Sequence, residues 1–166
     1  MRVREWYSIV ISPPEKVIYP VKDMKMLLYK NIGDYSSYNS EAHITIVNFK
    51  ADPAELNIVI RYVNDFSLRC SPKDLEFIKF ASFPKTFHLG ASSDTEQWFK
   101  ELVKRFSKRF PLNKTACEFE SSSTPHITIG RKLDVVEISM ACHLFENHSV
   151  DIVFECNSIT IRKFNK

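Results

Sequence analysis

The tetrapeptide His-Ile-Thr-Ile occurs twice in the chain, at residues 43–46 and again at residues 126–129. Successive side chains of a β-strand point to opposite faces, so each copy would place its histidine and threonine on one face and its isoleucines on the other. Each copy is followed by a predicted helix and then by a pair of predicted strands. The sequence therefore predicts an internal duplication that folds into one α+β unit rather than into two domains.

Capping and turn residues predict where the other elements begin and end. Asp52-Pro53-Ala54-Glu55 predicts a helix start, because aspartate caps, proline suits the first position and glutamate can complete a capping box. Ser93 and Glu96 predict a second capped start. A further helix is expected from Pro20, near its start, to a stop at Gly33. The expected strands cover residues 5–11, 75–80, 86–91, 150–156 and 158–164, and the last helix lies near 134–146.

Composition excludes several classes of protein. The three glycines of this 166-residue chain are scattered, so no glycine-rich phosphate loop is present, and the net charge of +3 does not by itself indicate nucleic-acid binding. The apolar run before Pro13 is too short for a signal peptide, and no segment approaches the length of a membrane span. The four cysteines form no C-x-x-C pair. We therefore expect a single-domain cytoplasmic protein with free thiols, and a monomer.

Two histidine and threonine pairs that face one cleft would suit phosphodiester chemistry. One imidazole can take a proton from an attacking water or hydroxyl group while the other protonates the leaving alkoxide. The threonine hydroxyls can donate to the non-bridging phosphate oxygens, which carry charge in the transition state. Histidine has an unperturbed pKa of about 6.5, so both of its protonation states are populated near neutral pH. The expected catalytic set, which needs no metal ion or other cofactor, consists of His43, Thr45, His126 and Thr128.

Other interpretations of the repeat compete with this one. A single histidine and threonine on a strand is usually a hydrogen-bonded or half-exposed pair, since strands favour threonine, but identical copies in both halves argue for chemistry. A metal site is disfavoured because each strand offers one histidine and no third acidic ligand at a suitable spacing. The alternative from a different class is a module that binds a nucleotide or RNA in the same cleft without turnover.

The segments that carry the repeat resemble the two signature motifs of the 2H phosphoesterase superfamily, especially its bacterial 2'-5' RNA ligase and cyclic phosphodiesterase branch. The resemblance extends over most of the chain through "YSIVISPPEKV", "HITI", "TFHLGAS" and "TPHITIGR". It implies two similar lobes of antiparallel sheet with helices around a central cleft, one His-x-Thr motif from each lobe, and hydrolysis or reversible ligation at 2',3'-cyclic or 2'-5' phosphates of RNA or nucleotides. The chain departs from many relatives within "SITIRKFNK", where Arg162 is followed by lysine instead of the serine often found there, so its substrate choice is open.

Two further residues are candidate substrate contacts. The resemblance implies that Arg131 contacts the substrate phosphate, although a residue three positions after Thr128 lies on the opposite strand face unless the strand bends. Gly130 could supply that bend, because glycine in a strand often marks a bulge. Tyr7, beside Trp6 in the first strand, could stack on a base, or it could pack in the core. Both Arg131 and Tyr7 are therefore expected as substrate-binding residues.

Overall fold

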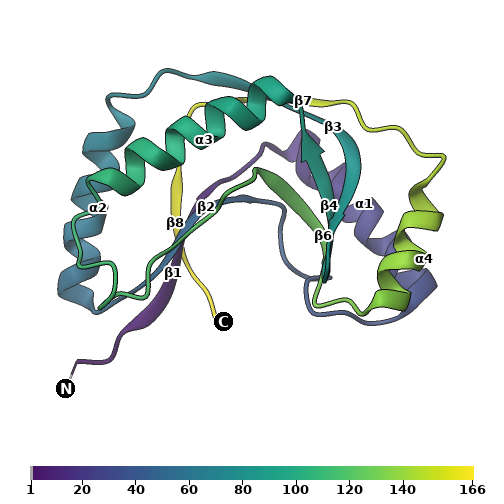
Figure 1. The fold of residues 1–166 in the computed structure, drawn as a ribbon, viewed down its shortest axis with the longest axis horizontal. Coiled ribbons are helices and arrows are strands. Elements are labelled where there is room, and N and C mark those ends of the chain that lie inside the picture. The colour runs from purple at the N-terminus through teal and green to yellow at the C-terminus, as the bar shows by residue number, and fades with distance from the viewer. Residues whose placement is uncertain (1) are drawn as a thin grey trace.

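A computed structural model describes residues 2–166 of the chain, which form an α+β fold (Figure 1). The elements in chain order are β1 (Glu5–Ile11), α1 (Glu15–Ile32), β2 (Ile44–Ala51), α2 (Pro53–Ser67), β3 (Lys73–Phe83), β4 (Thr86–Ala91), α3 (Ser93–Lys108), β5 (Glu120–Ser121), β6 (His126–Arg131), α4 (Val135–Phe145), β7 (Ile152–Cys156) and β8 (Thr160–Lys163). No helix among residues 2–166 combines the length and the apolar character needed to cross a membrane.

The strands form two antiparallel four-stranded sheets, with the orders β5-β2-β1-β8 and β6-β4-β3-β7. Each sheet contains one of the two tetrapeptide strands. In the first sheet β2 pairs with β1, and in the second β6 pairs with β4. With the halves divided between β3 and β4, two equivalent strands exchange: β3 comes from the first half but pairs with β4, and β8 comes from the second half but pairs with β1. The predicted duplication into two similar lobes is confirmed, and each lobe is completed by a strand from the other half.

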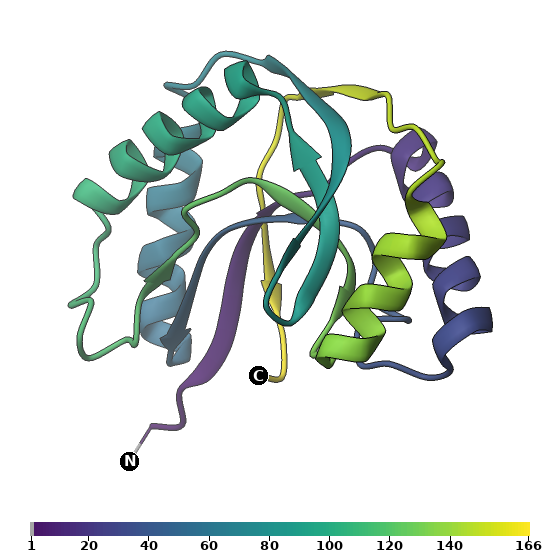
Figure 2. The ribbon, with the colours of Figure 1, turned by 45° about the vertical axis from the view of Figure 1, so that its right-hand side comes forward.

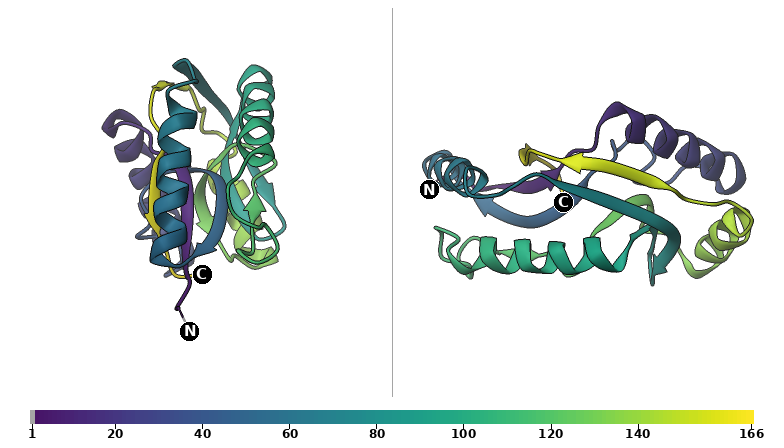
Figure 3. Two further views of the ribbon diagram at one scale, coloured as in Figure 1. Left: turned by 90° about the vertical axis from the view of Figure 1, so that its left-hand side faces the viewer. Right: turned by 90° about the horizontal axis from the view of Figure 1, so that it is seen from above.

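The helices cover the ends of this two-sheet body in pairs. The helices α2 and α3 lie together on one side and α1 and α4 lie together on the other, with the strands between them (Figure 2). Seen from above, the body is elongated along this direction (Figure 3). Seven phenylalanines are almost inaccessible in the single core cluster that joins both sheets to the helices. The phenylalanine-rich composition thus supplies one continuous core, which holds the two lobes together.

Helix α1 begins earlier than the sequence predicts. It starts at Glu15, and Pro20 lies inside it rather than at its start. The carbonyl of Pro14 accepts hydrogen bonds from Val17 and Ile18, at 2.8 and 3.1 Å, and so begins the helix. Pro20 is on the exposed face, where the loss of one backbone hydrogen bond is tolerated because water can satisfy the free carbonyl. The expected start at Pro20 is therefore wrong by about one and a half turns.

The capped helix starts are present where the sequence indicates them, with one shift. The Asp52 side chain accepts from the backbone of Glu55 at 2.9 Å and the Glu55 carboxylate accepts from Asp52 N at 2.9 Å, which is the predicted capping box of α2. The cap of α3 is Ser92 rather than Ser93, since the Ser92 hydroxyl accepts from the backbone N–H of Thr95. The difference is one residue, within the usual uncertainty of helix ends.

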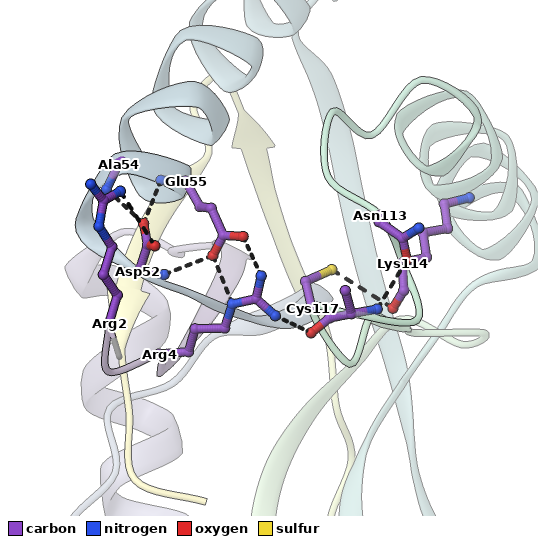
Figure 4. A network of polar contacts seen from close by, with 9 residues as sticks. Arg2, Arg4, Asp52, Ala54, Glu55, Asn113, Lys114 and Cys117 are labelled. Atoms are coloured by element: carbon purple, nitrogen blue, oxygen red, sulfur yellow. Dashed lines mark hydrogen bonds and ion pairs between the residues drawn. The ribbon is translucent and has the colours of Figure 1, made fainter.

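The N-terminal segment is fastened to the start of α2. The Arg4 guanidinium donates to both carboxylate oxygens of Glu55, one contact being 2.9 Å, and also to the backbone carbonyl of Ala116 (Figure 4). Arg2 forms an ion pair with Asp52 at 3.8 Å. Because Glu55 also closes the capping box, this network joins β1, α2 and the loop before β5 into one unit.

Candidate active site

The two His-x-Thr motifs face one cleft of about 290 Å³. His43 directly precedes β2 and Thr45 lies within it, while His126 and Thr128 lie in β6. All four isoleucines of the tetrapeptides have no exposed surface, so the polar faces point to the cleft and the apolar faces to the core, as expected. The rest of the cleft is lined by Lys25, Ser37, Ser40, Glu41, Asn48, Glu120, Ser121, Ser122 and Arg131.

Backbone carbonyls orient both imidazoles in the same way. His43 Nδ1 lies 2.8 Å from the carbonyl oxygen of Glu41, and His126 Nδ1 lies 2.9 Å from that of Thr124. A carbonyl can only accept, so each Nδ1 carries the hydrogen and donates it. Nε2 of each neutral ring is then left to accept or return a proton, which is the tautomer that acid–base chemistry in the cleft requires.

Arg162 lies beside the His43 ring. Its Nη1 is 2.9 Å from His43 Nδ1, but Nδ1 cannot both accept from a guanidinium and donate to the carbonyl of Glu41. The matching carbonyl contact at His126 favours the Nδ1–H tautomer, so we treat Arg162 as a cationic neighbour rather than as a donor to the ring. Burial first, and then the charges of Arg162 and Lys25, lower the pKa of His43 to about 4.

Aromatic side chains surround His126 instead. The ring of Phe83 meets it edge-on, with 5.2 Å between the centroids, and the ring of His88 lies 5.2 Å away. Phe83 also stacks on His88 at 4.2 Å. Burial lowers the pKa of His126, and the carbonyl of Thr124 partly offsets that effect. The two motif histidines therefore have identical local sequences but different electrostatic surroundings.

A β-bulge lies at the last isoleucine of each tetrapeptide, Ile46 in β2 and Ile129 in β6. The pairing register shifts opposite Ile9/Val10 in the first sheet and opposite Phe87/His88 in the second, so that one extra residue is accommodated in β2 and in β6. The shift turns Asn48 and Arg131, each five residues after its motif histidine, to the cleft side. The bend expected near Gly130 is thus present, and Arg131 lines the cleft.

The pairing of the strands shows that Arg162 and Phe83 occupy corresponding positions in the two lobes. Ser8 pairs with Asn48 on one side and with Arg162 on the other. In the second sheet, Thr86 pairs in the same way with Arg131 and with Phe83. Arg162 and Phe83 are therefore equivalent positions of the repeat, and the difference between them is the main asymmetry of the site.

The structure places Tyr7 away from the cleft. Its ring stacks on Phe49 in the core, with 5.8 Å between the centroids, and the residue is 9% exposed. Strand alternation sends the neighbouring Ser8 to the cleft side instead, where its hydroxyl donates to Asn48 Oδ1 at 2.6 Å. Tyr7 is therefore a core residue, and the expectation that it contacts the substrate is not carried further.

No sequence motif marks several residues in and around the cleft as site residues, among them Asn48, Arg162 and Lys25. Asn48 is turned inward by a bulge that no glycine marks in β2, and Arg162 reaches His43 from the far end of the chain. Lys25 lies in α1 and is 3% exposed. The spacing of Lys25 four residues after Val21 could have drawn attention to it, because a lysine in the buried stripe of a helix is unusual.

The described residues offer no cluster typical of a metal site. No group of three or more histidine, cysteine, aspartate or glutamate side chains within residues 2–166 is arranged to hold a metal ion. All four cysteines are free thiols. The chemical groups that the cleft does offer are imidazoles, hydroxyls, an amide, carboxylates and cations.

Two similar antiparallel lobes, each contributing one His-x-Thr motif to a shared cleft, define the class of the 2H phosphoesterases. A comparison with protein families agrees: the model described as "2'-5' RNA ligase superfamily" matches residues 13–166. The chain therefore belongs to the 2'-5' RNA ligase superfamily, as the motifs predict. Membership supports a phosphoesterase or ligase type of activity and RNA or nucleotide substrates. A comparison with curated proteins gave no match.

Proposed function

We propose that the chain is a metal-independent phosphoesterase that hydrolyses 2',3'-cyclic phosphates or 2'-5' linkages of RNA or nucleotides, or reversibly forms them, by two-histidine catalysis. The observation that carries the proposal is that two carbonyl-oriented imidazoles from opposite lobes line one cleft together with two hydroxyls and several cations. Membership of the 2'-5' RNA ligase superfamily supports the same reaction class.

In hydrolysis of a cyclic phosphate, the oxygen of water forms a bond to phosphorus as one neutral imidazole takes the water proton. The bond from phosphorus to one ribose oxygen breaks. The other imidazole, which is protonated beforehand, gives its proton to that oxygen. The products are a phosphomonoester and a free ribose hydroxyl. Thr45 and Thr128 donate to the non-bridging oxygens, where negative charge increases in the transition state.

The surroundings of the histidines assign their roles within this proposal. Burial, and then the charges of Arg162 and Lys25, lower the pKa of His43 and favour its neutral form, which suits the residue that accepts a proton. The pKa of His126 is lowered by burial, which a bound phosphate anion would counteract, so His126 suits the proton donor. His43 is therefore the proposed base and His126 the proposed acid for hydrolysis.

Turnover with defined substrates tests the proposal. The protein is incubated with each of the four 2',3'-cyclic nucleotides and with a short 2'-5' oligonucleotide, with and without excess chelator. We expect phosphomonoester or cleaved product from at least one of these substrates, at a rate that chelator leaves unchanged. A rate that collapses with chelator and returns with a divalent ion would contradict the two-histidine mechanism. Binding without turnover would favour the nucleotide-binding module.

A further inference from the structure

Lys25 is a buried cation without a carboxylate partner. It occupies the buried stripe of α1 between Val21 and Leu28, and only 3% of its surface is exposed. Its Nζ donates to the backbone carbonyls of Ser37, at 3.0 Å, and of Ser40. The ion pairs of residues 2–166 do not include it. A buried charge is costly unless an opposite charge or sufficient hydrogen bonds compensate it, so the burial of the Lys25 ammonium group needs an explanation.

The cleft gathers other positive charge around Lys25. Burial, and then the charges of Arg131 and Arg162, lower the pKa of Lys25 to about 8. Two carboxylates line the same cleft, but that of Glu120 already forms an ion pair with Lys166. Cations from α1, β6 and β8 therefore repel one another across the cleft, and an anion bound between them would relieve that repulsion.

We propose that Lys25 binds the phosphate of the substrate directly, through the N–H donor that its two carbonyl acceptors leave free. Together with Arg131 and Arg162 it makes the cleft favour the phosphate group over the uncharged parts of a nucleotide. This inference rests on the proposed function and assigns to that site a phosphate-binding residue outside both His-x-Thr motifs.

The contacts of Lys25 place it between the two motifs. The loop that accepts its hydrogen bonds continues to Glu41, whose carbonyl orients His43. In the same loop, the Ser37 hydroxyl accepts from the backbone N–H of Arg131 at 2.9 Å and so joins the end of β6. A phosphate within reach of His43 and Arg131 is therefore also within the part of the cleft that Lys25 lines.

Calorimetric titration of three proteins tests the inference. Wild type, Lys25→Gln and Lys22→Gln are titrated with adenosine 2'-monophosphate and with uncharged adenosine. Lys22 is the matched control, because it lies one turn earlier on α1 with an exposed side chain. Glutamine keeps a donor for the loop carbonyls but loses the charge. Because the lost hydrogen bond involves a charged group, Lys25→Gln should weaken the binding of the nucleotide about ten- to a hundredfold. The affinity of Lys25→Gln for adenosine, and the affinity of Lys22→Gln for the nucleotide, should equal those of wild type.

The outcomes separate this inference from the proposed function. Equal weakening of nucleotide and adenosine by Lys25→Gln, or no weakening, would mean that Lys25 only holds the loop. Wild type that binds no nucleotide would overturn both the inference and the proposed function.

A second measurement needs no variant. Inorganic phosphate is titrated into wild type between pH 7 and 9.5, and each affinity is expressed for the dianion, because phosphate changes from monoanion to dianion near neutral pH. The groups that face Lys25 are Arg131, Arg162, His43, Tyr35 and the Glu41 carboxylate. The arginines stay charged in this range, His43 is already neutral, and burial raises the pKa of Tyr35 above its usual value. Affinity should fall as the pH rises through about 8, where Lys25 loses its proton. Affinity that stays constant across the range would overturn the inference.

Discussion

Identical tetrapeptides do not give the two motif histidines identical chemistry. Arg162 lies 2.9 Å from His43 Nδ1, whereas the equivalent position beside His126 is occupied by Phe83. A guanidinium penalises a protonated imidazole through like-charge repulsion, whereas a phenylalanine ring carries no net charge that could do so. In the proposed mechanism this asymmetry, added to the effect of burial, makes His43 the base and His126 the acid.

Arg162→Gln should change the pH dependence of kcat/KM. In wild type we expect a bell-shaped profile whose acid limb reflects protonation of His43, with a pKa of about 4, and whose alkaline limb lies on the acid side of the usual histidine range. Removing the guanidinium raises the pKa of His43, so the acid limb should move to higher pH.

Lys163→Gln is the matched control for this change. Lys163 is the next residue of β8 and forms an ion pair with Glu5 at 2.6 Å, away from the cleft. The control should keep the wild-type acid limb. An acid limb that stays in place in Arg162→Gln would contradict the role given to the guanidinium.

The residues of the site could be predicted from sequence only as far as the repeat extends. Both His-x-Thr pairs stand out because they occur twice, and Arg131 follows the second pair closely. Lys25 and Arg162 come from α1 and β8, and only the folded chain brings them to the cleft. Tyr7 was expected at the cleft but lies in the core, because the sequence does not show which face of its strand an aromatic residue occupies.

Among the secondary-structure elements, the bulge at the end of each tetrapeptide decides which side chains reach the cleft. In β6 the bulged residue, Ile129, is followed by Gly130, and a Cβ built on Gly130 would lie 2.7 Å from Leu133 Cδ1 and 3.1 Å from Leu28 Cδ2. Both leucines are buried, so the strand can pack against them only if residue 130 has no side chain. Glycine is needed here for close approach rather than for an unusual backbone angle.

Gly130→Ala should therefore destabilise the protein, by about 1–3 kcal/mol as is typical of overpacking. Gly90→Ala is the comparison, because the nearest atom to its new Cβ would be Lys79 Cε, at 2.9 Å. Lys79 is exposed and flexible, so it can move into solvent at little cost. Urea unfolding of both variants measures the difference. If Gly90→Ala lowered the free energy of unfolding as much as Gly130→Ala, the explanation from the buried leucines would be wrong.

Helices and strands themselves were predictable where a local signal exists. The aspartate and glutamate of the α2 capping box specify that start within four residues. The start of α1 has no such signal, since the N-cap residue Pro14 has no side-chain acceptor and Pro20 suggests a later beginning.

At the scale of the whole molecule, the two halves of the chain are interleaved. The strands β3 and β8 each complete the sheet of the other half, and one core cluster extends through both lobes. The duplication was visible in the sequence, but the exchange of strands was not, because pairing between distant strands depends on contacts that no local pattern encodes. This interleaving holds the two motif histidines in one cleft although 83 residues separate them in the sequence.

In the proposed mechanism these two histidines act as one acid–base unit across the lobes. The turnover rates of His43→Ala, His126→Ala and the double variant on the best substrate found test whether they do. His143→Ala serves as a control, since that histidine is exposed on α4. Circular dichroism checks that each variant is folded.

Each single variant should lose about 10²–10⁴-fold in rate, and the double variant should be little slower than the slower single one, because residues of one catalytic unit are not additive. The control should keep the wild-type rate. Full activity in either His43→Ala or His126→Ala would contradict the account.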